Sequence, residues 1–144
     1  MFIAHRGKVT SGIIENSYLA LLNALNDPFY DGIELDIWET KDHHYIINHD
    51  FVYNYNLIKK QNLFTLESFG LCSLDSILNI PTSKIIMIEI KDFNISIKSF
   101  LTYLSKYQNQ NIYLMSFSKE LMNNIINYHP TYKCGLINIF YNNN

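Results

Sequence analysis

Two acidic residues, Glu34 and Asp36, stand two positions apart in residues 32–40, an otherwise largely apolar stretch typical of a β-strand. On a strand, alternate residues point to the same face and lie about 6 to 7 Å apart. Two carboxylates that close together in a half-buried place repel each other unless a cation or a shared proton lies between them. The pair therefore indicates either a metal site or a coupled pair of acids.

Other residues with useful chemistry stand at or next to the ends of three further predicted strands: His5, Arg6, His49, Glu89 and Lys91. In parallel α/β folds the carboxyl ends of the strands meet on one side, and ligands bind there. We therefore expect these side chains to converge with the acidic pair on one rim. A single charged residue at a strand end can arise by chance, whereas four strands in succession give a much stronger signal.

The carboxylates of this rim predict a metal. Three of them, with no cysteine beside them, favour a hard cation that prefers oxygen ligands, Mg²⁺ or Ca²⁺, over zinc. The candidate metal ligands are Glu34, Asp36 and Glu89.

The remaining rim residues complete a set suited to phosphoryl transfer. Arg6 and Lys91 carry fixed positive charges that suit phosphate oxygens. His5 and His49 exchange protons near neutral pH, so one can deprotonate a nucleophile while the other protonates a leaving alkoxide. The metal and the positive side chains would stabilise charge on the phosphoryl oxygens.

The elements that must position these residues alternate along the chain. Strands are predicted at residues 2–4, 32–40, 45–48, 85–91, 112–116 and 133–140, and helices at 17–26, 74–78, 97–104 and 118–128. Residues 51–64 show no clear period and are expected to form a loop. Asn16 is expected either to cap the first helix or to orient a site residue. This alternation indicates a parallel sheet with right-handed crossovers, either open or closed into a barrel.

Composition limits the classes of function. The chain has 144 residues, 48% of them hydrophobic, and a net charge of −2, which suits one soluble domain with no nucleic-acid partner. No apolar run reaches the roughly 18 residues of a membrane span. No basic segment of a signal peptide precedes the first strand, so we expect a cytoplasmic protein.

The chain resembles the glycerophosphodiester phosphodiesterase family in six motifs, in order and spacing: His5-Arg6-Gly7, Glu15-Asn16-Ser17, Glu34-Leu35-Asp36, Thr40-Lys41-Asp42, His49-Asp50 and Glu89-Ile90-Lys91. The resemblance implies a TIM barrel and metal-dependent hydrolysis of a glycerophosphodiester to glycerol 3-phosphate and an alcohol. It assigns the matching acids to the metal, the histidines to acid and base catalysis, and the basic residues to the phosphate. It also implies attack by the glycerol hydroxyl of the substrate itself, which gives a cyclic phosphate.

The chain departs from the family pattern at Ile14 and His43, where the family has proline and glycine, and also in length. A full barrel takes about 250 residues, whereas this chain has room for about six strands. We therefore expect residues 1–144 to form a single, incomplete TIM-barrel-like domain that lacks the last two strand–helix units. Its open sheet edges would need cover, for example in a homo-oligomer.

Two other functions remain open at this stage. The chain could be a catalytically inactive remnant that serves as a binding module. It could also be a related barrel phosphodiesterase that acts on phospholipids, of the phospholipase C or D type. The sequence Glu89-Ile90-Lys91 is closer to the glycerophosphodiesterase pattern than to that of the phospholipid-acting enzymes, which favours hydrolysis of glycerophosphodiesters.

Overall fold

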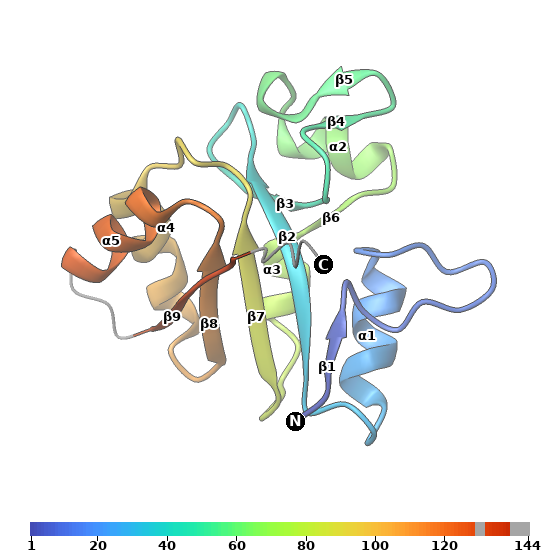
Figure 1. Cartoon of the computed structure of the whole chain (residues 1–144). Coiled ribbons are helices and arrows are strands. Elements are labelled where there is room, and N and C mark those ends of the chain that lie inside the picture. Colours follow the sequence, from blue (N-terminus) through green and yellow to red (C-terminus); the bar gives the residue numbers. More distant parts are fainter. Residues whose placement is uncertain (129–131, 139–144) are drawn as a thin grey trace, which may run out of the picture.

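The structure, a computed structural model, describes residues 1–128 and 132–138 and is centred on a seven-stranded sheet (Figure 1). The strand order is β6-β3-β2-β7-β8-β9, and β1 pairs with β2. The strands of this sheet are β1 (Ile3–His5), β2 (Gly32–Glu39), β3 (Tyr45–Ile47), β6 (Cys72–Ser73), β7 (Ile85–Ile90), β8 (Asn111–Ser116) and β9 (Lys133–Leu136). The helices are α1 (Tyr18–Asn26), α2 (Leu63–Ser68), α3 (Leu74–Leu78), α4 (Ile97–Leu104) and α5 (Lys119–Asn127).

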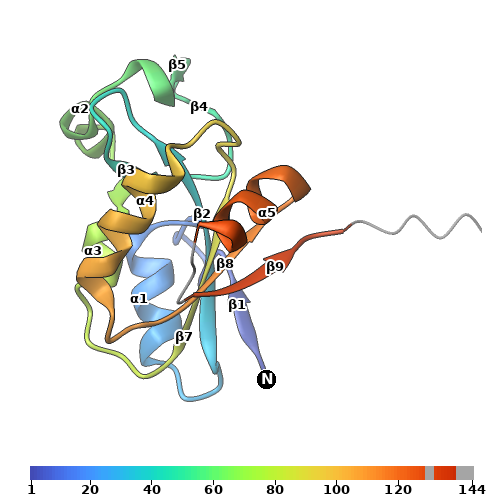
Figure 2. The same ribbon diagram turned by 90° about the vertical axis from the view of Figure 1, so that its left-hand side faces the viewer.

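The parallel part of the sheet confirms the predicted fold class. Strands β1, β2, β7, β8 and β9 run parallel to one another. Helices α1, α3 and α4 lie on one side of the sheet (Figure 2), and the outward residues Ile33, Leu35 and Ile37 of β2 are fully buried in the main apolar core. The architecture is α/β and matches an incomplete TIM-barrel-like sheet.

The third strand differs from the prediction, because β3 runs antiparallel to β2. Only residues 40–44 connect the two strands, and a parallel crossover needs a dozen residues or more. Among the described residues the parallel set therefore has five strands rather than six, three fewer than the eight of a full barrel. Strand β3 nevertheless runs back to the rim, since the backbone N–H of Asn48 donates to the carbonyl of Asp36 at 3.1 Å.

Residues 51–64, predicted as a loop, contain regular structure. They form a hairpin of β4 (Val52–Tyr53) and β5 (Asn56–Leu57), a 3-10 turn η1 (Ile58–Lys60) and the start of α2. The two hairpin-turn residues, Asn54 and Tyr55, both have positive φ, as a tight two-residue turn requires. The segment packs through a second small core of Ile46, Ile58 and Leu66, with Trp38 against it.

The remaining predicted helices and strands lie close to the residue ranges expected from the sequence. The last strand, β9, is assigned to Lys133–Leu136, and Phe140, its predicted end, lies outside the described residues. A further 3-10 turn, η2 (Ser105–Tyr107), follows α4. Both cysteines are free thiols. In the part of the chain that the structure describes, no helix is long and apolar enough to cross a membrane.

Candidate active site

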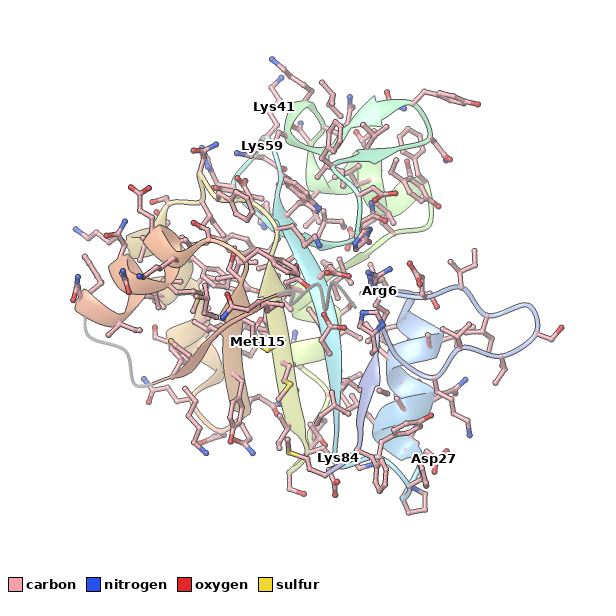
Figure 3. The ribbon with its side chains drawn as sticks, viewed as in Figure 1. Arg6, Asp27, Lys41, Lys59, Lys84 and Met115 are labelled. Atoms are coloured by element: carbon pink, nitrogen blue, oxygen red, sulfur yellow. The ribbon has the colours of Figure 1, made fainter. Side chains whose placement is uncertain are left out.

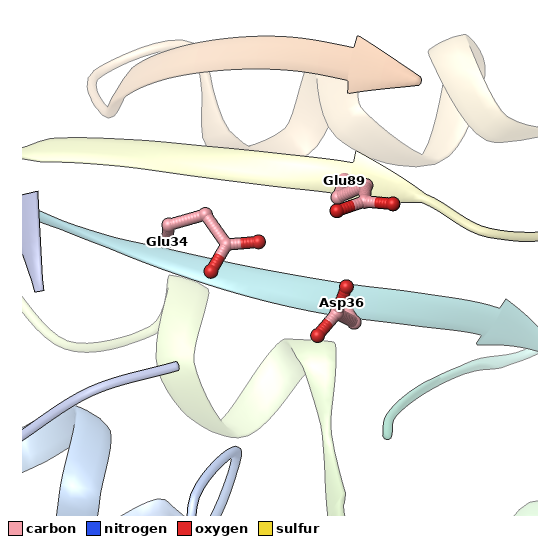
Figure 4. Close-up of side chains that lie close together, drawn as sticks. All are labelled: Glu34, Asp36 and Glu89. Atoms are coloured by element: carbon pink, nitrogen blue, oxygen red, sulfur yellow. The ribbon is translucent and has the colours of Figure 1, made fainter. Parts of the chain in front are cut away.

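Three carboxylates from two neighbouring strands meet on one face of the sheet (Figure 4). Glu34 and Asp36 project from β2, and Glu89 projects from β7. Asp36 is paired in register with Glu89, which places the two side chains next to each other. One carboxylate oxygen from each of the three lies within 4.8 Å of the other two, and all three residues are buried. The structure thus brings together the three predicted metal ligands.

Two positive side chains approach this triad. Arg6 Nε lies 3.2 Å from Oδ2 of Asp36, and Lys91 Nζ lies 2.9 Å from Oε1 of Glu89 and 3.7 Å from Oδ1 of Asp36. When all three carboxylates are ionised, they carry one negative charge more than the two positive groups balance. The buried Oδ1 of Asp36 also has no hydrogen-bond partner among the described residues. An unpartnered carboxylate oxygen in an all-oxygen cluster with excess negative charge fits a hard divalent cation.

The pKa of Glu34 lies well above its ordinary value. Burial, together with the nearby charges of Asp36 and Glu89, raises the pKa of Glu34 to about 7. The backbone N–H of Arg6 donates to its Oε2 at 3.0 Å and opposes part of that rise. Near neutral pH the Glu34 carboxyl therefore holds a proton part of the time, and a bound cation would displace that proton.

The loop after β1 is held in an unusual backbone conformation that aims Arg6 at the site (Figure 3). Arg6 itself has φ 56°, and Gly7 follows with φ 88°. A Cβ at Gly7 would lie 2.5 Å from the backbone carbonyl carbon of Ala20, so only glycine lets the loop approach α1 this closely. Glu15 then holds Nη1 of Arg6 at 2.7 Å. This packing explains why glycine follows His5-Arg6.

The two histidines have different surroundings. Nε2 of His5 lies 3.9 Å from Oε2 of Glu34, and its side chain is 70% exposed. His49 follows β3, where its Nδ1 is 2.8 Å from Oδ1 of Asp50. The backbone carbonyl of His49 accepts a hydrogen bond from Nε1 of Trp38 at 3.2 Å. His5 therefore lies within ion-pair distance of the triad, whereas His49 is bound by Asp50 and Trp38 and makes no ion pair with the triad in the described structure.

Asn16 does not cap the first helix. Ser17 is the N-cap of α1 and accepts a hydrogen bond from the backbone N–H of Ala20 at 3.2 Å. The side chain of Asn16 instead donates to Oδ2 of Asp36 at 2.8 Å. The capping prediction is wrong because a serine one residue later already satisfies the helix end. The contact predicted as the alternative, with a site residue, is present.

Sequence reasoning missed several residues that support this site. Glu15 and Asp50 belong to two of the six motifs, but the sequence assigned them no role. Phe117 follows β8, and its ring centroid lies 5.8 Å from Lys91 Nζ. Lys59 pairs at 2.7 Å with the buried Asp92, which ties η1 to the loop after β7. Nothing in the local sequence identified these last contacts, because they join segments far apart in the chain.

The candidate site thus combines a carboxylate triad and two positive side chains on a mostly parallel α/β sheet of incomplete TIM-barrel type. The sequence profile of the glycerophosphoryl diester phosphodiesterase family matches residues 5–96, more than half of the chain. The chain belongs to this family. All the predicted site residues lie within the match. A search of curated proteins found no match to the chain.

Solved structures of glycerophosphodiester phosphodiesterases share the fold. The protein from Thermotoga maritima is 23% identical, with a TM-score of 0.74, and the match covers 94% of this chain and 60% of that one. The protein from Parabacteroides distasonis is 19% identical, with a TM-score of 0.74 and coverage of 94% and 63%. The protein from Agrobacterium tumefaciens is 19% identical, with a TM-score of 0.69 and coverage of 92% and 64%. The chain thus spans about 60% of the length of these proteins.

Proposed function

We propose that this protein is a metal-dependent phosphodiesterase that hydrolyses glycerophosphodiesters to glycerol 3-phosphate and an alcohol. The observation that carries the proposal is the buried triad, in which Oδ1 of Asp36 has no hydrogen-bond partner among the described residues and three carboxylates face two positive side chains. Membership of the glycerophosphoryl diester phosphodiesterase family supports the same reaction class.

Each predicted residue then has a role that its surroundings suit. Glu34, Asp36 and Glu89 would hold Mg²⁺ or Ca²⁺, which when bound supplies positive charge to the phosphoryl oxygens. Arg6 and Lys91 already lie against the triad, where they would bind the remaining phosphate oxygens.

The histidines would move the protons. One removes the proton of the attacking glycerol hydroxyl, and the other protonates the leaving alkoxide, which gives a cyclic phosphate and the alcohol. Water would then open the cyclic phosphate to glycerol 3-phosphate, with the two histidines exchanging roles. His5 lies against Glu34 with most of its ring exposed to an incoming substrate. Asp50 binds Nδ1 of His49, which fixes the orientation of the ring and leaves Nε2 for proton transfer. Asn16 would orient Asp36, the central ligand.

A hydrolysis assay tests the proposal. The purified chain should release glycerol 3-phosphate from glycerophosphocholine with Mg²⁺ or Ca²⁺, and a chelator should stop the reaction. Glu89→Gln should abolish turnover and metal binding without unfolding the protein. Glu120→Gln is the matched control, because Glu120 is exposed on α5, and it should behave like the unchanged protein. Full activity in Glu89→Gln would contradict the metal assignment.

The sheet is incomplete, so the proposal includes how its free edges are covered. In the described structure β1 pairs only with β2, and β9 pairs only with β8, so both strands have a free edge. We propose that residues 1–144 act as one domain and that a second copy covers these edges. Measuring the mass in solution alongside activity tests this idea, since activity should be confined to the dimer. Cytoplasmic residence stays a prediction from the sequence, and the proposed reaction would give the protein a place in glycerol and lipid metabolism.

The free edges also support one alternative, a binding module without catalysis. A soluble monomer that is inert with every divalent metal would favour that alternative over the phosphodiesterase.

A further inference from the structure

Two aromatic rings form an open corner beside His49. The ring centroids of Trp38 and Phe51 lie 6.4 Å apart, and the ring planes meet at 60°. Trp38 is half-buried, while Phe51 is 59% exposed. The corner therefore presents aromatic surface to solvent next to a candidate catalytic group.

The Trp38 wall of the corner is fixed in place. Trp38 is on the same strand face as Asp36, two residues further along β2. The ring packs against the small core of Ile46, Ile58 and Leu66. Its Nε1 donates to the carbonyl of His49 at 3.2 Å. A group held against this wall would thus lie next to His49.

The charges around the corner favour a cation over an anion. The carboxylate of Asp50 is next to Phe51 in the chain, is 74% exposed, and lies 2.8 Å from Nδ1 of His49. The positive side chains of the site, Arg6 and Lys91, are both engaged by carboxylates. Among the described residues, no lysine or arginine lies over the ring of Trp38 or Phe51, whereas Lys91 already lies over that of Phe117.

We propose that the Trp38–Phe51 corner binds the quaternary ammonium group of the leaving alcohol. The preferred substrates would then be glycerophosphodiesters of quaternary ammonium alcohols. Quaternary ammonium groups are held by aromatic faces, with each cation–π contact worth about 0.5 to 2 kcal/mol. The alcohol would leave beside His49. The substrate preference rests on the proposed function, whereas binding of the cation at the corner does not.

Binding can be measured without catalysis, because Trp38 is the single tryptophan of the sequence. Choline should change the tryptophan fluorescence of the full chain saturably, and 3,3-dimethylbutan-1-ol, its uncharged isostere, should bind at least about fivefold more weakly. Phe51→Ala should weaken choline binding about fivefold to tenfold, and Phe51→Tyr should restore it. Phe64→Ala is the matched control, since Phe64 is an exposed phenylalanine on α2 outside the corner. Equal binding of the two probes, or no binding of choline, would overturn the proposal.

Kinetics separate the corner from the reaction. The ratio of kcat/KM for glycerophosphocholine to that for glycerophosphoglycerol should be about tenfold and should fall toward one in Phe51→Ala. If all diesters are hydrolysed equally and Phe51→Ala leaves the ratio unchanged, the corner assignment fails and the proposed function stands. If no diester is hydrolysed but choline binds selectively, the proposed function fails and the corner still stands as a binding site for the cation. A Phe51-dependent preference for lysophosphatidylcholine over glycerophosphocholine would assign the corner to an acyl chain and overturn the proposal.

Discussion

Asn16 binds Asp36 at two points. Nδ2 of Asn16 donates to Oδ2 of Asp36 at 2.8 Å, and Oδ1 of Asn16 accepts from the backbone N–H of Asp36 at 3.3 Å. Both residues are buried, and Asn16 adopts φ 56°, a left-handed conformation that asparagine tolerates better than most residues. The double contact fixes Oδ2 of the central carboxylate, while Oδ1 has no hydrogen-bond partner in the described part of the chain.

Removing this amide should weaken metal binding. Asn16→Ala is expected to lower the affinity for Mg²⁺ or Ca²⁺ about tenfold, because groups that orient a ligand typically contribute that much. It should also lower the free energy of unfolding by about 1 to 3 kcal/mol, since Asp36 loses a buried donor. Metal titration by calorimetry and urea unfolding measure the two effects.

The neighbouring residue provides the control. Ser17→Ala removes the N-cap of α1, which costs about 1 kcal/mol of stability, but it leaves Asp36 with its donor. Equal loss of metal affinity in the two variants would show that the effect of Asn16 is general destabilisation and not orientation of the ligand.

The raised pKa of Glu34 makes the stability of the metal-free protein depend on pH. The pKa is about 7 in the folded protein against 4.5 ordinarily, so between these values the folded state binds more protons than the unfolded state. The contribution of Glu34 is then fully present below pH 4.5 and is lost as the pH rises to about 7. The loss is on the order of 3 kcal/mol. Urea unfolding at pH 5 and pH 8 measures it.

Glu34→Gln isolates this effect from the titration of the histidines. The variant should lose less stability than the unchanged protein between pH 5 and pH 8, whereas Glu120→Gln should lose as much. Divalent metal should stabilise the unchanged protein more at pH 8 than at pH 5, because protons compete with the metal for Glu34 at the lower pH. Identical pH slopes for Glu34→Gln and the unchanged protein would rule out the raised pKa.

The triad was predictable from the sequence because strand geometry fixes it. Alternation places Glu34 and Asp36 on one face, and two parallel strands in register bring Glu89 beside Asp36. The predicted direction of β3 was wrong, although the short connection of residues 40–44 already required a hairpin-like return. His49 was expected at the carboxyl end of a parallel strand. It follows an antiparallel strand instead, whose end lies beside Asp36.

The contacts that could not be predicted join segments without a local pattern. Asn16 and Ser17 are both good N-cap residues, and only the position of Asp36 decides which of them caps α1. Lys59 and Asp92 are distant in sequence and meet because the segment after β3 folds over β2. Such pairings depend on tertiary packing, about which residue propensities and hydrophobic periodicity give no information.

Glycine at position 7 should be indispensable. Gly7→Ala places a Cβ 2.5 Å from Ala20 in a conformation with φ 88°, and we expect a loss of at least about 3 kcal/mol in the free energy of unfolding. Gly12→Ala is the control with a similar φ of 81° and open space around it, and it should cost about 1 kcal/mol. Thermal unfolding of both variants compares close packing with backbone strain alone. Equal losses would mean that the contact with α1 contributes nothing.

Lys91 should have opposite effects on metal binding and on catalysis. Its ammonium lies 2.9 Å from Glu89 and 3.7 Å from Asp36, where it neutralises charge that a metal would otherwise use. Lys91→Met should therefore raise the affinity for Mg²⁺ or Ca²⁺ about fivefold, because two unit charges at about this distance interact by about 1 kcal/mol even in the high dielectric constant of water. In the same variant kcat/KM should fall, since a positive group for the phosphate is lost.

The opposite signs make this prediction informative. A residue that only supports the fold would lower metal affinity and activity together when it is removed. Lys98→Met, on the exposed side of α4, controls for the loss of one positive charge from the whole protein and should change neither quantity. Glycerol 3-phosphate, the expected product, adds a direct test, because it should inhibit Lys91→Met less than the unchanged protein if Lys91 binds the phosphate. Unchanged inhibition together with tighter metal binding would limit the role of Lys91 to charge balance within the triad.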